Sequence, residues 1–143
     1  MNAPSVLLGG TTAVAVQGRA LLIEGNPGSG KSSLALALID RGAVLIGDDG
    51  VLLTRRGAAL LATPPPRIEG LLEVRGVGLV RVPTAAAAAA LILRLDPGAE
   101  RFPEEAARRE LLGVVIPALP FRAGDAVQAL RAEYALRMHG LAD

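Results

Sequence analysis

Residues 25–32, with the sequence GNPGSGKS, have the types and spacing of a loop that binds phosphate. They match the pattern G-x-x-x-x-G-K-[ST] at every defined position. The glycines let backbone amides curl around phosphate oxygens without a Cβ in the way, and a following helix adds the partial positive charge of its N-terminus. In such a loop Lys31 reaches the β- and γ-phosphates, and the Ser32 hydroxyl is a ligand of Mg²⁺. The segment therefore predicts a nucleoside triphosphate site without specifying the reaction.

An acidic pair, Asp48 and Asp49, comes soon after this loop, at the end of the apolar run 43–46. A carboxylate at the end of a buried strand beside a phosphate loop is placed to hold Mg²⁺ or to accept a proton. The letters GDDG are also typical of a turn, so the pair alone fits either interpretation. The short interval after Lys31 disfavours ordinary GTPases and motor ATPases. Because Lys31 is the only lysine, an Asn-Lys-x-Asp guanine-binding segment is excluded.

A third polar segment, residues 72–79 with the sequence LEVRGVGL, places Glu73 and Arg75 beside two glycines, Gly76 and Gly78. A carboxylate, a guanidinium and flexible backbone suit a segment that approaches phosphate and metal. When the segment is considered alone, a surface ion pair followed by a turn is the slightly favoured interpretation of the same residues.

The composition excludes several other kinds of site. The 143 residues include no cysteine and one histidine, carry a formal charge of +1 and are 2% aromatic. Thiolate cages, disulfides and multi-histidine metal sites are therefore excluded, and broad binding of nucleic acid or anionic lipid is disfavoured. The apolar run 82–93 is shorter than the roughly 20 residues that span a bilayer, and the first residues lack the basic region of a signal peptide. A cytoplasmic protein with no membrane or nucleic-acid partner is expected.

The elements that must position these residues are short strands and one helix. A strand over 20–24 enters the loop, a helix over 31–41 leaves it, and a buried strand over 43–46 precedes the acidic pair. Further strands are predicted at 6–8, 12–16, 51–54 and 58–61, with hairpin turns at 17–18 and 55–57. This alternation predicts a single α/β domain over residues 1–143 with a mixed sheet.

The second half of the chain is expected to be less regular. Residues 68–82 are predicted as a loop, 96–109 as an exposed excursion, and 111–116 as a strand. The alanines 85–90 fit one or two helical turns, although 91–95 is strand-like. The clearest helix is predicted over 125–139, capped by Asp125 and ended by Gly140, with an apolar face that belongs to the core or to an oligomer contact. That face consists of Val127, Leu130, Tyr134 and Met138. The arginine pairs 55–56 and 108–109 are expected on solvated faces, and His139 is expected to complement the helix dipole.

The order of phosphate loop, Gly-Asp-Asp and Glu-x-Arg-Gly-x-Gly resembles the bacterial HPr kinase/phosphorylase family, over residues from about Leu7 to Leu141. The chain is similar to a short form that holds only the family's catalytic domain. The resemblance implies a P-loop-containing catalytic domain of the phosphoenolpyruvate carboxykinase-like fold. It also implies an enzyme that uses ATP and Mg²⁺ to phosphorylate a serine of HPr, the phosphocarrier of the phosphotransferase sugar-uptake system. The family is hexameric through this domain, so a homo-oligomer is expected.

The same resemblance implies a role for each matching residue. Asp48 corresponds to the general base and Asp49 supports it, Glu73 completes the metal shell begun by Ser32, and Arg75 and Lys31 face the transferring phosphoryl group. Gly76, Gly78 and the late-loop Arg122 correspond to substrate-facing positions. The residues assigned to the nucleotide are Gly25, Asn26, Pro27, Gly28, Ser29, Gly30, Lys31, Ser32 and Ser33.

Three departures from the family pattern bear on the reverse reaction, in which inorganic phosphate removes the phosphoryl group from HPr. Gly10 stands where the family carries a histidine near its catalytic aspartate, Ser33 stands in place of an acidic residue, and Asp125 lies where a second late-loop cation is usual. We therefore expect the phosphorylase direction to be weak or absent. A nucleotide-sensing module that transfers nothing and a small-molecule kinase on the same fold stay open as alternatives. The retained Asp48, Glu73 and Arg75 argue against the sensor, which has no need of a base.

Overall fold

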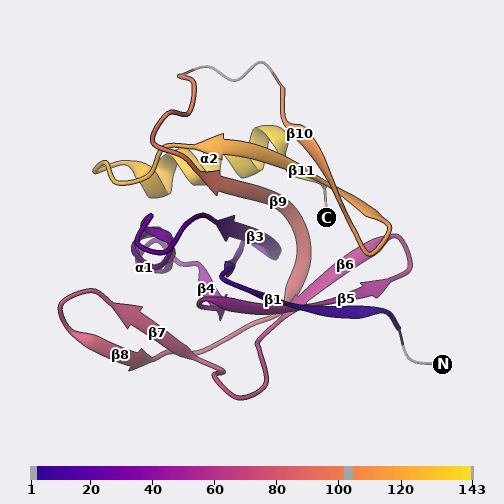
Figure 1. Cartoon of the computed structure of the whole chain (residues 1–143), viewed down its shortest axis with the longest axis horizontal. Helices are drawn as coiled ribbons and strands as arrows, with labels where there is room; N and C mark the ends of the chain where they lie inside the picture. Colours follow the sequence, from indigo (N-terminus) through magenta and orange to yellow (C-terminus); the bar gives the residue numbers. More distant parts are fainter. Residues whose placement is uncertain (1–2, 102–104, 143) are drawn as a thin grey trace.

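The computed structural model describes residues 3–101 and 105–142 (Figure 1). The elements in chain order are β1 (Ser5–Gly9), β2 (Thr12–Val16), β3 (Arg19–Glu24), α1 (Lys31–Asp40), β4 (Val44–Gly47), β5 (Gly50–Arg56), β6 (Ala59–Thr63), β7 (Leu71–Val74), β8 (Gly78–Arg81), β9 (Ala87–Leu95), β10 (Ala107–Leu111), β11 (Val114–Phe121) and α2 (Gln128–His139). Neither helix in this described part is long and apolar enough to cross a membrane.

Within the described ranges, nine strands form one mixed sheet in the order β1-β5-β6-β9-β3-β2-β4, with β11 paired to β9 and β10 paired to β11. Strand β9 runs parallel to β3 and to β11, and the other pairings are antiparallel. Figure 1 shows β9 as a long curved strand, and this curvature lets its first residues pair with β6 and its last with β11. The predicted mixed α/β sheet is confirmed.

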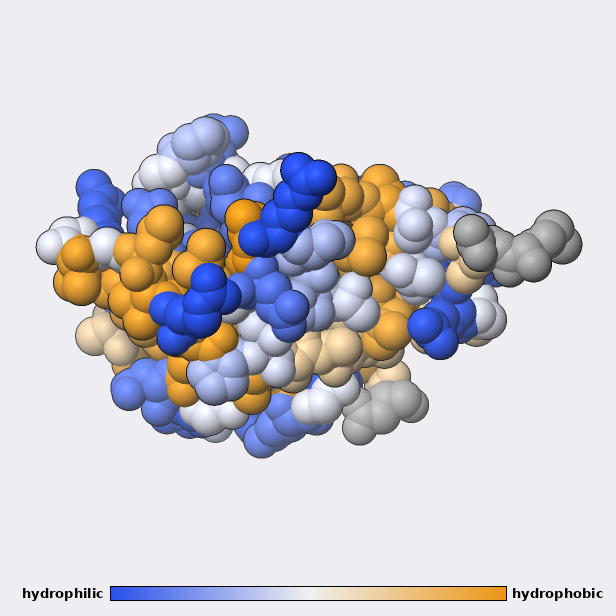
Figure 2. All heavy atoms as spheres, turned by 90° about the horizontal axis from the view of Figure 1, so that it is seen from below, coloured by the Kyte–Doolittle hydropathy of each residue, from blue (hydrophilic) through white to orange (hydrophobic). Residues whose placement is uncertain are grey.

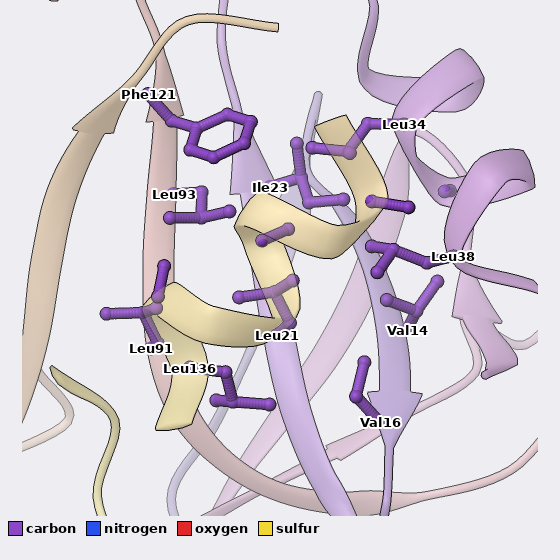
Figure 3. Packing of buried hydrophobic residues seen from close by; sticks show 14 of the residues in the cluster. Val14, Val16, Leu21, Ile23, Leu34, Leu38, Leu91, Leu93, Phe121 and Leu136 are labelled. Carbon is purple, nitrogen blue, oxygen red and sulfur yellow. The ribbon is translucent and has the colours of Figure 1, made fainter. Parts of the chain in front are cut away.

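The two faces of this sheet carry separate apolar clusters. Helices α1 and α2 cover one face, where Leu34 and Leu38 of α1 and Leu136 of α2 meet Leu21 and Leu91 of the central strands (Figure 3). The opposite face is enclosed by the curl of the sheet itself, and side chains such as Leu22, Ile92 and Leu53 fill it. Because strand side chains alternate between faces, β3 and β9 contribute to both clusters, and the strand that leads into the loop of residues 25–30 is held from both sides.

The predicted strands and turns of the first half are confirmed within one or two residues. Strands β2 and β3 form a hairpin around Gln17 and Gly18, both with positive φ. Strands β5 and β6 form a second hairpin, although its turn lies at Gly57–Ala58 and not at 55–57, because Arg55 and Arg56 still pair with β6.

Three predictions for the second half are corrected. Residues 68–82 were expected as a loop, but β7 and β8 form a two-stranded hairpin in which Glu73 pairs with Leu79. The alanines from Ala87 onward belong to strand β9, because pairing with β3 and β6 outweighs the helical preference of alanine. The predicted strand 111–116 contains a turn at Leu112 and Gly113, both with positive φ, which separates β10 from β11. In the excursion predicted over 96–109, residues 102–104 lie outside the described part, and β10 begins at Ala107.

The predicted N-cap of the last helix is corrected, and of the two alternatives for its apolar face, core or oligomer contact, the core is contradicted. Helix α2 begins at Gln128, and Asp125 Oδ1 accepts a hydrogen bond from the Val127 amide (3.0 Å) in a turn before the helix, so Asp125 is not its N-cap. The predicted stripe is the solvent side, with exposed fractions of 49% for Val127, 37% for Leu130, 55% for Tyr134 and 75% for Met138. The helix packs instead through Ala129, Ala132, Ala135 and Leu136. Three of these four side chains are alanines, which allow a helix to pack close to its neighbours.

Candidate functional site

The loop of residues 25–30 connects the end of β3 to the first turn of α1. Gly30, with φ 104°, is the residue before the helix, and its left-handed backbone turns the chain directly into the helical turn that begins at Lys31. A side chain at Gly25 would come within 2.6 Å of Ser29 Oγ and 3.1 Å of Leu95 Cβ, so the loop closes tightly on itself and on β9. Loop amides and the N-terminus of α1 therefore meet at the carboxyl edge of the parallel strands, the arrangement that binds phosphate.

The single lysine lies inside this loop. Lys31 is 9% exposed, and its Nζ donates hydrogen bonds to the carbonyl oxygens of Gly25 (2.7 Å) and Asn26 (3.3 Å). These contacts hold the ammonium group against the loop backbone, and no anionic side chain among the described residues pairs with it.

A buried carboxylate joins the three segments that the sequence singled out. Asp48, at the end of β4, accepts hydrogen bonds from the Ser32 hydroxyl on Oδ1 (2.7 Å) and from the Glu73 amide on Oδ2 (2.9 Å). A third donor, the Thr12 hydroxyl, also binds Oδ1 (3.0 Å). Asp48 thus links the first turn of α1, directly after the loop of residues 25–30, to the β7–β8 hairpin, so the three segments meet at one carboxylate.

The second member of the acidic pair has a different environment. Asp49 is exposed, and its φ of 59° is a left-handed conformation that is uncommon for a side chain other than glycine. Its amide donates to Thr12 Oγ1 (3.1 Å), and its carbonyl oxygen accepts from the Gly10 amide (3.0 Å). Gly10, which stands where the resemblance places a histidine, therefore contacts the acidic pair only through backbone, and no atom lies within 4 Å of the position that its Cβ would occupy.

The hairpin β7–β8 supplies the remaining charged groups. Glu73 lies in β7, and Arg75 lies in the turn that Gly76 and Gly78 form with positive φ. Among the described residues neither side chain has a hydrogen bond or an ion pair, so both remain available to a ligand. The two glycines thus explain why the hairpin turns sharply enough to bring Arg75 back to the loop.

These groups line a cavity of about 390 Å³, comparable in size to small-ligand sites. Its lining residues are Thr12, Pro27, Gly28, Gly30, Lys31, Ser32, Ser33, Asp48, Asp49, Glu73 and Arg75. Two cations and three carboxylates give the lining a formal charge of −1, so its side chains do not by themselves neutralise a triphosphate, and a divalent cation would supply positive charge. No group of three His, Cys, Asp or Glu side chains in the described ranges forms a metal cage. A hydroxyl and separate carboxylates suit Mg²⁺, which keeps several waters and phosphate oxygens.

Some predicted site residues lie elsewhere. Arg122 is exposed and does not line the cavity, although its neighbour Ala123 approaches Gly30, with 3.9 Å between the Ala123 Cβ and the position that a Gly30 Cβ would take. Gly76 and Gly78 shape the hairpin and do not line the cavity either. His139 lies in the last turn of α2, as predicted.

Sequence reasoning missed two contributors to the site region. Thr12 is fully buried between the phosphate loop strand and the acidic pair, and nothing in its neighbourhood in the sequence signals this role. Arg109 was expected on a solvated face, but it forms a bidentate ion pair with Glu24, the residue before the loop (2.6 and 3.1 Å). The hydrogen bonds to Glu24, and secondarily its charge, raise the pKa of Arg109 against the lowering effect of burial. This pair ties β10 to the end of β3.

Comparisons with known proteins identify relatives of this chain. Residues 3–93 match the family model described as the HPr Serine kinase C-terminal domain. The HPr kinase/phosphorylase of Ralstonia nicotianae is 35% identical over 129 residues, which cover 81% of this chain and 40% of that protein. The enzyme of the same name from Clostridium tetani is 43% identical over 82 residues, covering 57% of this chain and 27% of that protein. The chain therefore spans well under half the length of these relatives.

The solved structure of the Hpr(Ser) kinase/phosphatase from Coxiella burnetii has the same fold, with a TM-score of 0.75 at 23% identity over 94% of this chain and 92% of that one. The matched residues 3–93 include residues 25–32, the acidic pair and the β7–β8 hairpin, which are the three segments that meet at Asp48. The chain belongs to the HPr serine kinase C-terminal domain family.

Proposed function

We propose that this chain is a protein serine kinase that uses ATP and Mg²⁺ to phosphorylate the phosphocarrier HPr. The observation that carries the proposal is the junction at Asp48, where the phosphate loop and the β7–β8 hairpin meet a buried carboxylate on the wall of one cavity. Phosphoryl transfer needs positioning and charge neutralisation more than covalent chemistry, and these groups supply both. Action on HPr would place the protein in the cytoplasm.

The nucleotide is assigned to the loop of residues 25–30 and the first turn of α1. Loop amides and Lys31 hold the β- and γ-phosphates, and Ser32 and Glu73 are the residues that would hold Mg²⁺. When bound, the cation neutralises phosphate charge that the net negative cavity does not. Arg75 lies across the cavity with no ion-pair partner in the described chain, so its guanidinium is free to face the transferring phosphoryl group.

Asp48 is assigned as the general base, and the hydrogen bonds select one oxygen for this role. Oδ1 already accepts from two hydroxyls, those of Thr12 and Ser32, whereas Oδ2 accepts only the Glu73 amide. A carboxylate oxygen has two acceptor sites, so Oδ2 retains one for the hydroxyl of the substrate serine. As the serine oxygen bonds to the γ-phosphorus, its proton passes to Oδ2, the bond to the β–γ bridging oxygen breaks, and ADP leaves. Asp49, exposed beside it, supports the negative charge of the site.

The surface beside the cavity favours a protein over a small molecule as substrate. In the β7–β8 hairpin, Val77 is 76% exposed and Leu79 is 70% exposed, next to Arg75. Figure 2 shows hydrophobic residues gathered on the face seen from below, on the side where this hairpin lies in Figure 1. An exposed apolar rim at a polar cavity fits contact with a macromolecule. The exposed stripe on α2, with Tyr134 and Met138, similarly supports association of copies of the chain as a homo-oligomer.

The test is transfer of labelled γ-phosphate from ATP to purified HPr in the presence of Mg²⁺, with phosphoserine identified in the product. Asp48→Ala should abolish the transfer, and ATP binding, measured separately by calorimetry, should persist. Asp40→Ala, at the exposed far end of α1, is the matched control and should behave as wild type. Labelling of HPr by Asp48→Ala at the wild-type rate would remove the base assignment. ATP binding without any labelled HPr would instead favour a sensor or a small-molecule kinase.

The proposal extends to the reverse reaction. Because Gly10 offers no side chain to the acidic pair, we propose that phosphorolysis of seryl-phosphorylated HPr is weak or absent. Release of pyrophosphate at a rate comparable to the forward reaction would contradict this.

A further inference from the structure

We propose that Thr12 is a positioning residue for the acidic pair, and that its hydroxyl determines which oxygen of Asp48 meets the substrate. The expected effect of Thr12 on the reaction rate rests on the proposed function, but its effect on the arrangement of Asp48 and Asp49 does not. Thr12 is the first residue of β2, it is fully buried, and it lies on the wall of the cavity.

The Thr12 hydroxyl has a defined direction. Its oxygen accepts a hydrogen bond from the Asp49 amide (3.1 Å), and a backbone amide can only donate. The hydroxyl hydrogen is therefore directed to its other neighbour, Asp48 Oδ1 (3.0 Å). One side chain thus connects the two members of the acidic pair, through the backbone of Asp49 and the carboxylate of Asp48.

This connection has two consequences for the site. With Ser32 also donating to Oδ1, both acceptor sites of that oxygen are filled, and Oδ2 is turned to the Glu73 amide and the cavity. In addition, Asp49 keeps its left-handed backbone, with φ 59°, between the Thr12 hydroxyl and the Gly10 amide. Such a conformation persists only where its surroundings determine it, and Thr12 supplies the side-chain part of that support.

The test compares Thr12→Val with Thr12→Ser. Valine keeps the shape and strand preference of threonine but removes the hydroxyl, whereas serine keeps the hydroxyl and removes only a methyl group. The matched control is Thr11→Val, the same change one residue earlier, at a buried position with no hydrogen bond to either aspartate. Circular dichroism verifies the fold of each variant, and Thr12→Ala, which cannot introduce a clash, replaces Thr12→Val if the latter does not fold.

The first readout is the NMR signal and hydrogen exchange of two backbone amides. In Thr12→Val the Asp49 amide loses its acceptor and should exchange faster. The Glu73 amide should also shift, although Thr12 does not touch it, because Asp48 links the two. Both amides should stay at their wild-type positions in Thr12→Ser and in Thr11→Val. An unchanged Glu73 amide in Thr12→Val would overturn the proposal, whatever the protein phosphorylates.

The second readout is kinetic. Loss of a group that orients a catalytic residue should lower kcat for HPr phosphorylation roughly 10–100-fold and leave the KM for ATP nearly unchanged. Thr12→Ser should restore most of kcat, because it restores the hydroxyl that orients Asp48. Failure of serine to restore kcat would refute the positioning role. If wild type labels no HPr, the proposed function fails, and the amide readout still decides the role of Thr12.

Discussion

Truncation of Leu136 tests which side of α2 faces the core. Leu136 is 1% exposed and lies in the cluster between α1, α2 and the central strands, beside Leu21 and Leu91 (Figure 3). Leu130, on the opposite side of the same helix, is 37% exposed. Leu136→Ala and Leu130→Ala are therefore the same chemical change at two positions that the structure places in different environments.

The expected magnitudes differ widely. Leu136→Ala removes three buried carbons and leaves a cavity between a helix and a sheet, which costs about 2–5 kcal/mol of unfolding free energy. Domains of this size have roughly 5–15 kcal/mol in total, so the loss is a large part of it. With about 2–4 °C per kcal/mol, a loss of about 3 kcal/mol lowers Tm by about 10 °C. Leu130→Ala should cost less than about 1 kcal/mol, because much of that side chain stays in contact with water and alanine favours the helix.

The assay is urea unfolding followed by circular dichroism, with the midpoint and slope fitted for each variant at one protein concentration. The slope should stay constant, so that the shift in midpoint reports stability alone. If Leu130→Ala lost as much stability as Leu136→Ala, the packing face assigned to α2 would be wrong and the stripe predicted from the sequence would be the core face. Sedimentation of both variants shows whether Leu130→Ala acts through association of copies.

Two further substitutions test the site. Lys31→Arg keeps the charge but replaces the compact ammonium group inside the loop by a wider, planar guanidinium group. We expect kcat to fall about 10²–10³-fold with the fold retained, as for the loss of one transition-state contact. Near-normal turnover of this variant would contradict the assignment of Lys31 to the phosphates. Gly47→Ala would press a Cβ against the carbonyl oxygen of Gly50 and within 2.9 Å of Pro65 Cδ, so it should displace the intervening acidic pair, lower Tm and abolish transfer. The control is Gly9→Ala, because nothing lies within 4 Å of the Cβ that this change adds. If the two variants had equal effects in thermal melts and phosphorylation assays, the crowding at Gly47 would not be the cause of the lost stability and activity.

The errors of the sequence-based predictions have a common physical origin. The alanines of β9 favour a helix by their intrinsic propensity. In the structure they lie between β3 and β6, where pairing satisfies their backbone groups, and their small side chains fit the inside of the curled sheet. The stripe Val127, Leu130, Tyr134 and Met138 has helical spacing, but residues of α2 with small side chains pack closer to α1 and the sheet. Hydrophobic periodicity indicates that a helix has two different faces, but it does not indicate which face packs against the rest of the protein.

Local chemistry was sufficient for the features that depend on neighbouring residues. The loop of residues 25–32, the helix that follows it, the hairpin turn at Gln17–Gly18 and the acidic pair at the end of β4 could be predicted from the sequence by itself, because glycine placement and strand endings are short-range properties. The order of three motifs also indicated the family. Only the tertiary structure decided that Thr12, Ser32 and Glu73 converge on Asp48, since their hydrogen bonds join positions far apart in the chain. Pairing of β2 with β4 and docking of the β7–β8 hairpin create those contacts, and no local pattern encodes the distance between them.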